Sequence, residues 1–564
     1  MLQFDTAEEK KVEELKIQEA EELAQVLAQK YNLPYIDLTK FAINTDALRL
    51  IPEAEARAAT IAAFKIVGRT LYLALLSPAN SKVQAIIEDL KSKNFVPLLY
   101  LCSEASLRRA FERYVEISRA AYTKAGIIDV SNEAIAEFIG KIQSIADLRT
   151  LFAKESQEAM RAGGVSGLLE VMLAGSIATE ASDIHVEPQE AQVRLRYRLD
   201  GVLHDIAFFN QRIYQRLLSR VKLISGLKLN IQRAAQDGRF SILLQDTEIE
   251  IRASILPGAY GESIVLRLLN PKTIGIPLEE LGMEPFLLSV VGRELGKPNG
   301  MILLTGPTGS GKTTTLYAFL RKVSTESNKI ITIEDPIEYH LVGINQTQVN
   351  PSKSYTFLTG LRSALRQDPD IIMVGEIRDK ETAQTAIHAS LTGHLVFSTL
   401  HTNNAAGTIP RLIDLGINPK IIDSALNIAM AQRLVRRLCS VCRIKSPPTP
   451  EEKKLLAEVA ASIQKKRPGV VLPPATELWR SAAGGCDKCQ YTGYKGRIGV
   501  FEAILMSPAV ARLIVANPNE RELRIAAQEQ NILDMRQDGI VKVLEGITTL
   551  DELARVVDVY VEII

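Results

Sequence analysis

A glycine-rich run in the middle of the chain has the composition of a phosphate-binding loop. The sequence from Gly306 to Thr313 fits the pattern GxxxxGK[ST] at every position, with an apolar run before it and a helical pattern after it. In such a loop, backbone N–H groups surround phosphate oxygens and the start of the helix adds positive potential. The lysine reaches the terminal phosphates and the next hydroxyl holds Mg²⁺. The predicted nucleotide-binding residues are Gly306, Pro307, Thr308, Gly309, Ser310, Gly311, Lys312, Thr313 and Thr314.

Acidic residues follow two further apolar runs. Glu376 comes directly after IIMVG, and Glu334 directly after IITI. Ligands of parallel sheets lie at the carboxyl ends of the strands, so a carboxylate there can orient a water or accept its proton. Gly375 stands where an Mg²⁺-binding aspartate is usual, so the metal would depend on Thr313, water and another acid. A helix cap or solvated loop is the simpler interpretation for any one acid, but two such strand ends beside the loop favour catalysis.

Histidines flank a third apolar run. His394 precedes LVFSTL and His401 follows it. At the ends of a strand in the same sheet, these side chains could read the terminal phosphate or the neighbouring glutamate. A lone histidine is more often a packed or solvated residue than a sensor. The spacing alone leaves both interpretations open.

Four of the five cysteines form two CxxC pairs, Cys439 with Cys442 and Cys486 with Cys489. Four thiolates at this spacing suit tetrahedral Zn²⁺. Redox chemistry is the rival interpretation, but a single CxxC pair would be enough for it. The sequence therefore favours a closed, structural zinc site. The fifth cysteine, Cys102, ends an apolar run and is predicted to lie in a core.

The elements that carry these residues follow from hydrophobic patterning. Between about 280 and 435, short apolar runs alternate with helical patterns, which is typical of a parallel sheet wound with helices. The predicted strands are 301–305, 329–333, 371–374 and 394–399.

A different pattern, of strict alternation, indicates a second sheet over about 165–275. In VRLRYRL the apolar residues alternate with arginines, and Asp200–Gly201 is a hairpin-turn signal. Two later alternating runs place Arg252 and Arg267 on polar faces. For each arginine alone, a solvated sheet face is the simpler interpretation.

Nearer the start of the chain, the pattern indicates a small α/β domain. Strands are predicted at 71–76 and 95–101, with a helix between them and a helix after them that begins at the N-cap Ser103. Residues 5–30 have the spacing of a solvated amphipathic helix.

Length and charge narrow the class of protein. The chain has 564 residues, enough for about three to five domains, and a net charge of +1 from 67 basic and 66 acidic residues. With this balanced charge, the chain as a whole has no electrostatic preference for nucleic acid. No apolar run reaches the length of a membrane-spanning helix and the charged start does not resemble a signal peptide. A cytoplasmic location is therefore expected.

Four boxes in order show a resemblance to a known family. The runs GPTGSGKTTTLY, ITIEDPIEY, LRSALRQDPDIIMVGEIRD and TGHLVFSTLHTN resemble the Walker A, Asp, Walker B and His boxes of secretion ATPases, the motors of type II secretion and type IV pilus assembly. ASDIHVEP, RYRLDGVL, QDGRFS and GESIVLRLLNP resemble the family's second N-terminal domain, which is PAS-like. NLPYIDLTKFAINTDALRLIP resembles its first N-terminal domain, and GYKGRIGVFEAI and EGITTLDELARVV its C-terminal region. The resemblance covers about residues 30–560.

The resemblance implies a role for each matching residue. Lys312 and Thr313 would bind phosphate and Mg²⁺, and Glu376 would be the catalytic glutamate. The remaining assignments are Glu334 as an acid near metal and water, His394 and His401 as the His box, Arg252 and Arg267 as γ-phosphate arginines from the mobile N-terminal half, and Arg362 and Arg366 as a further basic pair four residues apart on one helix face.

The fold class expected from the resemblance is multidomain α/β, with a RecA-like P-loop ATPase core, a PAS-like N-terminal domain, a further N-terminal α/β domain and a tetracysteine zinc element. The predicted boundaries are 1–116 for the first domain, 117–164 for a helical linker, 165–280 for the PAS-like domain, 281–435 for the ATPase domain, 436–500 for the tetracysteine element and 501–564 for a C-terminal helical region.

The resemblance also implies assembly and partners. A homo-hexamer is expected to use ATP, Mg²⁺ and Zn²⁺ at the inner face of the cytoplasmic membrane, bound to a platform protein and a membrane-anchored docking protein. The tetracysteine element argues against a retraction motor, and the RLGxx motif with which some relatives bind cyclic di-GMP is absent from the start of the sequence. A nucleotide-gated scaffold with little turnover and a nucleic-acid translocase are the alternatives.

Overall fold

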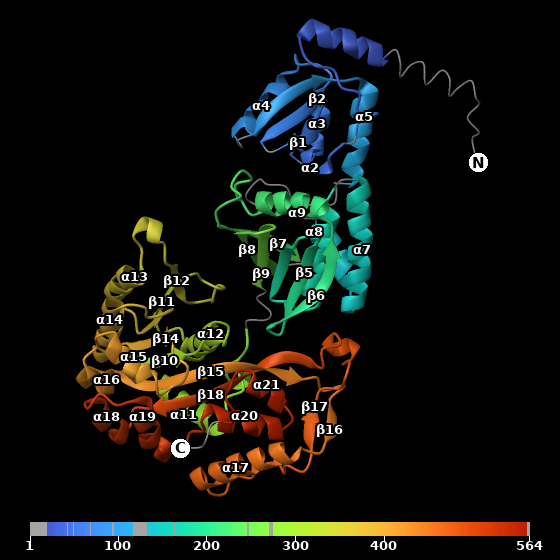
Figure 1. Cartoon of the computed structure of the whole chain (residues 1–564). Helices are drawn as coiled ribbons and strands as arrows, with labels where there is room; N and C mark the ends of the chain where they lie inside the picture. Colours follow the sequence, from blue (N-terminus) through green and yellow to red (C-terminus); the bar gives the residue numbers. More distant parts are fainter. Residues whose placement is uncertain are drawn as a thin grey trace. The chain divides into compact units, whose positions relative to one another are not determined.

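The computed structural model describes most of the chain as two compact units, which divide between Asn270 and Pro271 (Figure 1). The residues described are 20–41, 43–48, 50–67, 69–92, 95–116, 132–162, 164–244, 247–269 and 275–560. The predicted N-terminal helix falls partly outside these ranges, and residues 20–31 of it are helical. None of the helices in these ranges is long and apolar enough to cross a bilayer.

A three-stranded sheet forms the core of the first α/β part. β1 (Ile61–Val67) pairs antiparallel with β2 (Thr70–Leu75), which pairs parallel with β3 (Val96–Leu101). The crossover between the parallel strands is α4 (Ser81–Ser92), and α5 (Glu104–Glu112) follows with the Ser103 hydroxyl accepting from the Ser106 amide at 3.0 Å. The predicted strands, helices and N-cap are confirmed. The short helices are α2 (Thr45–Leu48), α3 (Glu53–Ala59) and the 3₁₀ turn Arg113–Glu116.

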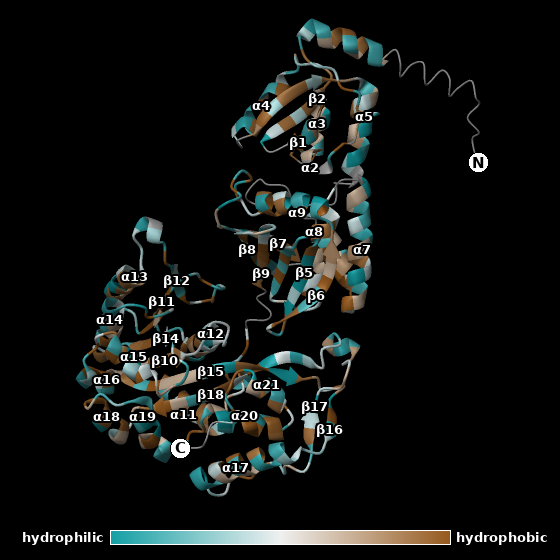
Figure 2. Ribbon diagram, viewed as in Figure 1, coloured by the Kyte–Doolittle hydropathy of each residue, from teal (hydrophilic) through white to brown (hydrophobic). Residues whose placement is uncertain are grey.

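The second part of this unit is a six-stranded antiparallel sheet in the order β6-β5-β4-β9-β8-β7. In β5 (Val193–Leu199) buried and half-buried residues alternate as predicted, and the hairpin turn has positive φ at Asp200 (47°) and Gly201 (86°). The brown and teal alternation along these strands is visible in Figure 2. The other elements are α6 (Asn132–Lys141), α7 (Ile145–Ala162), α8 (Ser166–Ala178), β4 (Asp183–Pro188), β6 (Val202–Phe209), α9 (Gln211–Ile224), β7 (Gln236–Leu244), β8 (Thr247–Gly258) and β9 (Gly261–Leu269).

The second unit is built around a seven-stranded sheet in the order β12-β11-β13-β14-β10-β15-β18. All its pairings are parallel except that of β15 with β18. The central strands are buried on both faces because one hydrophobic cluster covers each side. The strands are β10 (Gly300–Thr305), β11 (Ile330–Glu334), β12 (Asn345–Gln348), β13 (Ile371–Val374), β14 (Leu395–Leu400), β15 (Leu426–Leu438) and β18 (Tyr494–Leu505).

The predicted strands of this sheet are confirmed to within one residue. Their continuous apolar runs suit strands that are covered on both faces. The surrounding helices are α11 (Pro285–Leu295), α12 (Lys312–Val323), α13 (Phe357–Ala364), α14 (Lys380–Leu391), α15 (Thr408–Asp414) and α16 (Pro419–Ala425).

The C-terminal part packs on the same sheet. Its helices are α17 (Pro450–Lys466), α18 (Pro508–Ile514), α19 (Glu520–Ala526), α20 (Met535–Leu544) and α21 (Leu550–Ala554), and β16 (Ile444–Ser446) pairs with β17 (Leu478–Arg480). The 3₁₀ turns of this unit are Leu278–Glu280, Pro351–Lys353, Leu365–Gln367, Asp487–Cys489 and Gln528–Gln530.

A buried ion pair joins β15 to α21. Arg436 Nη2 lies 2.5 Å from Glu552 Oε2, with side-chain exposures of 15% and 5%, and the guanidinium stacks 4.1 Å from the Tyr494 ring centroid. Glu552 also accepts from Arg555 Nη1 at 2.9 Å. One carboxylate therefore fixes the C-terminal helix against the strand next to β10.

Replacing Glu552 by alanine should destabilise the second unit by about 3–5 kcal/mol, because Arg436 would stay buried without its partner. Trp479 is the only tryptophan in the sequence, and its ring centroid lies 4.2 Å from Arg443 Cζ in this unit. Its fluorescence during urea unfolding therefore reports the change in stability. Asp551→Ala removes an exposed acid of the same helix and serves as the control. Equal stability of the two variants would contradict the prediction.

Candidate nucleotide and metal sites

The phosphate-binding loop joins the carboxyl end of β10 to the start of α12. Gly306, Gly309 and Gly311 have φ values of 145°, 80° and 90°, which residues with a Cβ rarely adopt. The helix begins at Lys312, and the N–H groups of its first turn have no acceptor within the helix. The loop therefore has the donors and the geometry to surround an anion.

The side chain of Lys312 lies along this loop. Its Nζ donates to the carbonyl oxygens of Gly306 at 2.7 Å and Pro307 at 3.1 Å. Burial lowers the pKa of Lys312, and the nearby Glu376 carboxylate opposes this shift. The charge of Glu376 thus acts on the lysine, although the largest effect on Lys312 is its own burial.

Two residues of β15, which the sequence patterns did not predict, pack against the phosphate loop. Gln432 is buried, and its Oε1 accepts from Thr315 Oγ1 of α12 at 2.8 Å. A Cβ on Gly311 would lie 2.8 Å from Gln432 Nε2, and one on Gly306 2.7 Å from the Gln432 carbonyl. The sequence feature that could have indicated Gln432 is an amide that follows the apolar run IAMA.

Arg433 is the second of these residues. A Cβ on Gly306 would lie 3.2 Å from its Nη1, and its Nη2 donates to the Asn403 carbonyl at 2.7 Å. Burial lowers the pKa of Arg433, and the Glu502 carboxylate raises it.

Glu376 and His401 meet beside the loop. Glu376 lies two residues beyond β13, and His401 directly follows β14, its neighbour in the sheet. Their closest atoms, Glu376 Oε2 and His401 Nε2, are 3.4 Å apart, and the other carboxylate oxygen is paired with Arg378. The Glu376 side chain is 14% exposed, so it is both held in place and open to a ligand.

Glu334 is deeply buried at the end of β11. Its carboxylate accepts from Thr332 Oγ1 at 2.5 Å, from Gln346 Nε2 at 3.1 Å and from the Tyr317 hydroxyl. Burial raises the pKa of Glu334, although these three donors oppose the shift. The side chain is thus fixed between β12 and α12, and Asp335 directly follows it in the chain.

His394 lies at the opposite end of β14 from His401. Leu395 pairs with Gly300 at the start of β10, whereas Leu400 pairs with Thr305 at its end. Six residues of strand span about 20 Å. The His394 ring nitrogen Nδ1 lies 3.0 Å from the Ala389 carbonyl. Within one chain the structure brings His401 to the loop but not His394.

The pair Arg362 and Arg366 differs from the prediction. Arg362 is in α13, but the helix ends at Ala364 and Arg366 lies in a 3₁₀ turn, Leu365–Gln367. The two residues therefore do not share one regular α-helical face, because the tighter turn rotates Arg366 relative to α-helical spacing. The 3₁₀ turn is followed by Asp368, whose φ of 52° is in the left-handed region, directly before Pro369.

Arg252 and Arg267 belong to the first unit. They pair directly across β8 and β9, so both side chains lie on the same face of that sheet. Arg267 Nε donates to Asp183 Oδ1 at 3.0 Å, and Arg252 Nε lies 3.4 Å from Glu250 Oε1. The structure brings the two arginines together, as a basic pair on a half-buried sheet.

The four cysteines of the CxxC pairs converge on one point. Three of their Sγ–Sγ separations are 3.8 Å, and all four sulfurs lie within 4.8 Å of one another. A disulfide would bring two sulfurs to about 2.05 Å, whereas four sulfurs at about 2.3 Å from a tetrahedral ion lie about 3.8 Å apart. The Gly493 amide donates to Cys489 Sγ at 3.2 Å. The cluster has the size of a tetrahedral metal site, and none of its four cysteines is in a disulfide.

Comparison with known proteins places the chain in a family. A family model described as "Type II/IV secretion system protein" matches residues 158–555, and one described as "MshEN domain" matches residues 31–121. The chain belongs to the type II/IV secretion system protein family. The resemblance found in the four boxes is thereby confirmed.

Relatives of this family come from two systems. Type II secretion system protein E of Aeromonas hydrophila is 44% identical over 389 residues, covering 69% of this chain and 75% of the relative. The type IV pilus assembly ATPase PilB of Myxococcus xanthus is 34% identical over 536 residues, covering 95% and 91%. PilB of Thermus thermophilus is 36% identical over 544 residues, covering 95% of this chain but 58% of the longer relative.

Among solved structures, the ATPase DotB of Yersinia pseudotuberculosis superposes with a TM-score of 0.50 at 20% identity, covering 70% of this chain and 93% of that one. The fold is thus that of the RecA-like secretion proteins, as expected from the sequence.

Changing Glu334 to glutamine should stabilise the second unit at neutral pH and have little effect in acid. Because the pKa of Glu334 is raised in the folded state, its contribution is most favourable at low pH and is lost as the pH rises through the folded value. Urea unfolding followed by Trp479 fluorescence at pH 5 and pH 7.5 tests this. A stability difference that does not depend on pH would contradict the expected sign.

Proposed function

We propose that this protein hydrolyses ATP and drives the assembly of a type IV pilus or of a type II secretion pseudopilus. The observation that carries this proposal is the meeting of Lys312, Glu376 and His401 at one edge of the sheet. A phosphate loop alone binds nucleotide, whereas a carboxylate held beside it can activate water. Membership of the secretion family supplies the class of work done.

The proposed chemistry assigns a task to each side chain. The loop amides and Lys312 hold the phosphates, and the Thr313 hydroxyl binds the Mg²⁺ that compensates their charge. Glu376 orients the attacking water and accepts its proton, while His401 and Arg378 keep the carboxylate in position. Because residue 375 is a glycine, a further acid would complete the metal shell. Glu334 and Asp335 are the candidates, because they lie at the end of the neighbouring strand β11.

We also propose that Arg252 and Arg267 neutralise charge on the γ-phosphate when a first unit (residues 1–270) docks on a second unit (residues 271–564). Hydrolysis would then depend on the arrangement of the two units and could be converted into their movement. We place this motion in a homo-hexamer at the inner face of the cytoplasmic membrane. The hexamer would be bound to a platform protein and a membrane-anchored docking protein.

Both candidate systems have support. The PilB of Myxococcus xanthus aligns with 95% of this chain, including the MshEN region, which favours pilus assembly. Type II secretion protein E of Aeromonas hydrophila has the higher identity, 44%, but over 69% of this chain. Loss of surface pili, as opposed to loss of secreted enzymes, in a deletion strain would separate them.

Replacing Glu376 by glutamine should lower ATP turnover by about 100-fold or more while nucleotide binding survives, since proton transfer is removed and the loop is intact. Lys312→Ala should instead abolish binding. Phosphate release and binding of a fluorescent ATP analogue measure the two steps. Wild-type protein that retains ATP without releasing phosphate would support the nucleotide-gated scaffold instead, and DNA-stimulated hydrolysis would support the translocase.

We propose that the tetracysteine cluster holds one structural Zn²⁺. Purified protein should contain about one zinc per chain by mass spectrometry of the metal, and Cys442→Ser should reduce that content and destabilise the second unit. Cys102→Ala removes a cysteine from a different core and should leave the zinc content unchanged. Protein that contains no zinc and takes none up after reduction would refute the site.

A further inference from the structure

The segment after His401 is attached at several points and is here called the strap, residues 402–407. At its start, the Thr402 amide donates to Thr305 Oγ1 at 2.8 Å, at the end of β10. The Asn403 carbonyl accepts from Arg433 at 2.7 Å. This side of the strap is thus fixed to β10, which leads into the phosphate loop, and to the neighbouring strand β15.

The other side of the strap is held by two acids of the C-terminal part. Glu502 Oε1 of β18 accepts from the Ala405 amide at 2.7 Å, and Glu520 Oε2 accepts from Asn404 Nδ2 at 2.8 Å. The second oxygen of Glu502 accepts from the Met535 amide at 3.2 Å, at the first residue of α20. One carboxylate therefore joins the strap to the start of a helix.

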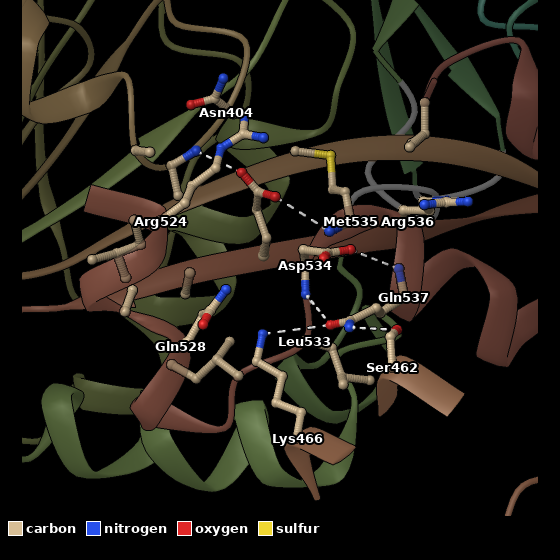
Figure 3. A pocket seen from close by; sticks show the side chains of 18 of the residues that line it. Asn404, Ser462, Lys466, Arg524, Gln528, Leu533, Asp534, Met535, Arg536 and Gln537 are labelled. Atoms are coloured by element: carbon tan, nitrogen blue, oxygen red, sulfur yellow. Dashed lines mark hydrogen bonds between the residues drawn. The ribbon is translucent and has the colours of Figure 1, made fainter. Parts of the chain in front are cut away.

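A cavity of about 670 Å³ lies beside this carboxylate (Figure 3). Its walls include the strap residues Asn403 to Ala406, Glu502 and the first turn of α20. The charged residues that line it further include Arg433, Lys466, Arg524 and Asp534. Small ions can thus reach Glu502, and the site can be probed chemically.

We propose that Glu502 is a positioning residue for hydrolysis, and this inference rests on the proposed ATPase function. By fixing Ala405, Glu502 fixes the strap, and the strap fixes His401, whose Nε2 lies 3.4 Å from the Glu376 carboxylate. Glu502 itself contacts none of the nucleotide-site residues by a hydrogen bond in the described part of the chain; it acts through the backbone.

Two features separate this role from general packing. Ala405 is buried, with an exposure of 1%, and the Glu502 carboxylate is the acceptor of its amide, so removing that acceptor leaves the buried amide without its protein partner. The path from Ala405 to His401 is only four residues long and is attached to β10 at Thr402. A change at Glu502 should therefore reach His401 and Glu376 through the strap, while the packing of Gln432 against the phosphate loop stays intact.

The test compares Glu502→Ala with Glu529→Ala in the full-length protein. Glu529 is an exposed acid that lines the same cavity and makes no hydrogen bond to the strap. For Glu502→Ala we expect kcat to fall by about 10- to 100-fold, because small misplacements of catalytic groups have effects of this size, with little change in the KM for ATP. Glu529→Ala should behave like wild type.

Formate is the probe for rescue. Added to Glu502→Ala, it can enter the cavity and accept from the exposed amides, so kcat should rise with formate concentration, whereas Glu529→Ala and wild type should not respond. Glu502→Gln, which keeps one acceptor oxygen, should retain more activity than Glu502→Ala. Hydrogen exchange of the peptide over 402–407 should be faster in Glu502→Ala and slow down again with formate.

The outcomes separate two failures. If wild type hydrolyses ATP and Glu502→Ala matches Glu529→Ala in kcat and in strap exchange, the positioning role is wrong and the proposed function stands. A loss of activity that neither formate nor Glu502→Gln relieves would also overturn the role, since it would indicate damage to the fold. If wild type itself releases no phosphate, the proposed function fails, while the exchange experiment still tests whether Glu502 holds the strap.

Discussion

The parallel register of β10, β14 and β13 is the constraint on which the candidate site depends. Thr305 pairs with Leu400, and Val374 pairs with Ser398 on the other side of β14, so three chain segments leave the sheet at the same edge. The phosphate loop directly follows β10, His401 directly follows β14, and Glu376 lies two residues beyond β13. Their proximity therefore needs no special contact: it follows from strand direction and from where each apolar run ends.

This constraint explains which parts of the site could be predicted. The loop, Glu376 and the cysteine pairs are local patterns whose spacing carries their chemistry, and the strand ends could be read from apolar runs. His394 shows the limit of the same reasoning. Two histidines flanking one strand look equivalent in a sequence, but the ends of a strand lie on opposite edges of the sheet. Arg366 shows another limit, because three more residues of α-helix and the three-residue 3₁₀ turn that follows α13 have nearly the same residue pattern.

The supporting residues were beyond prediction for a different reason. Gln432 meets Thr315 across 117 positions of sequence, and Glu502 meets Ala405 across 97. Such contacts depend on the position of β15 and β18 as the last two strands in the order of the sheet. No short sequence pattern encodes that position. A polar residue in an otherwise apolar strand is the usable signal, since a buried amide or carboxylate must find a partner.

The structure also separates two kinds of support for the same chemistry. Gln432 of β15 packs against the glycines of the phosphate loop, which would support binding, and Glu502 of β18 holds the strap after His401, which would support the proposed activation of water. β15 is adjacent in the sheet to β18, the strand that carries Glu502. Arg436 on β15 also forms an ion pair with Glu552 of α21. A force applied to the C-terminal part would thus reach both supports through one pair of strands. On the proposed roles of these residues, nucleotide retention and turnover would depend on different contacts of the C-terminal part, which suits a motor that must hold ATP until its neighbour is in position.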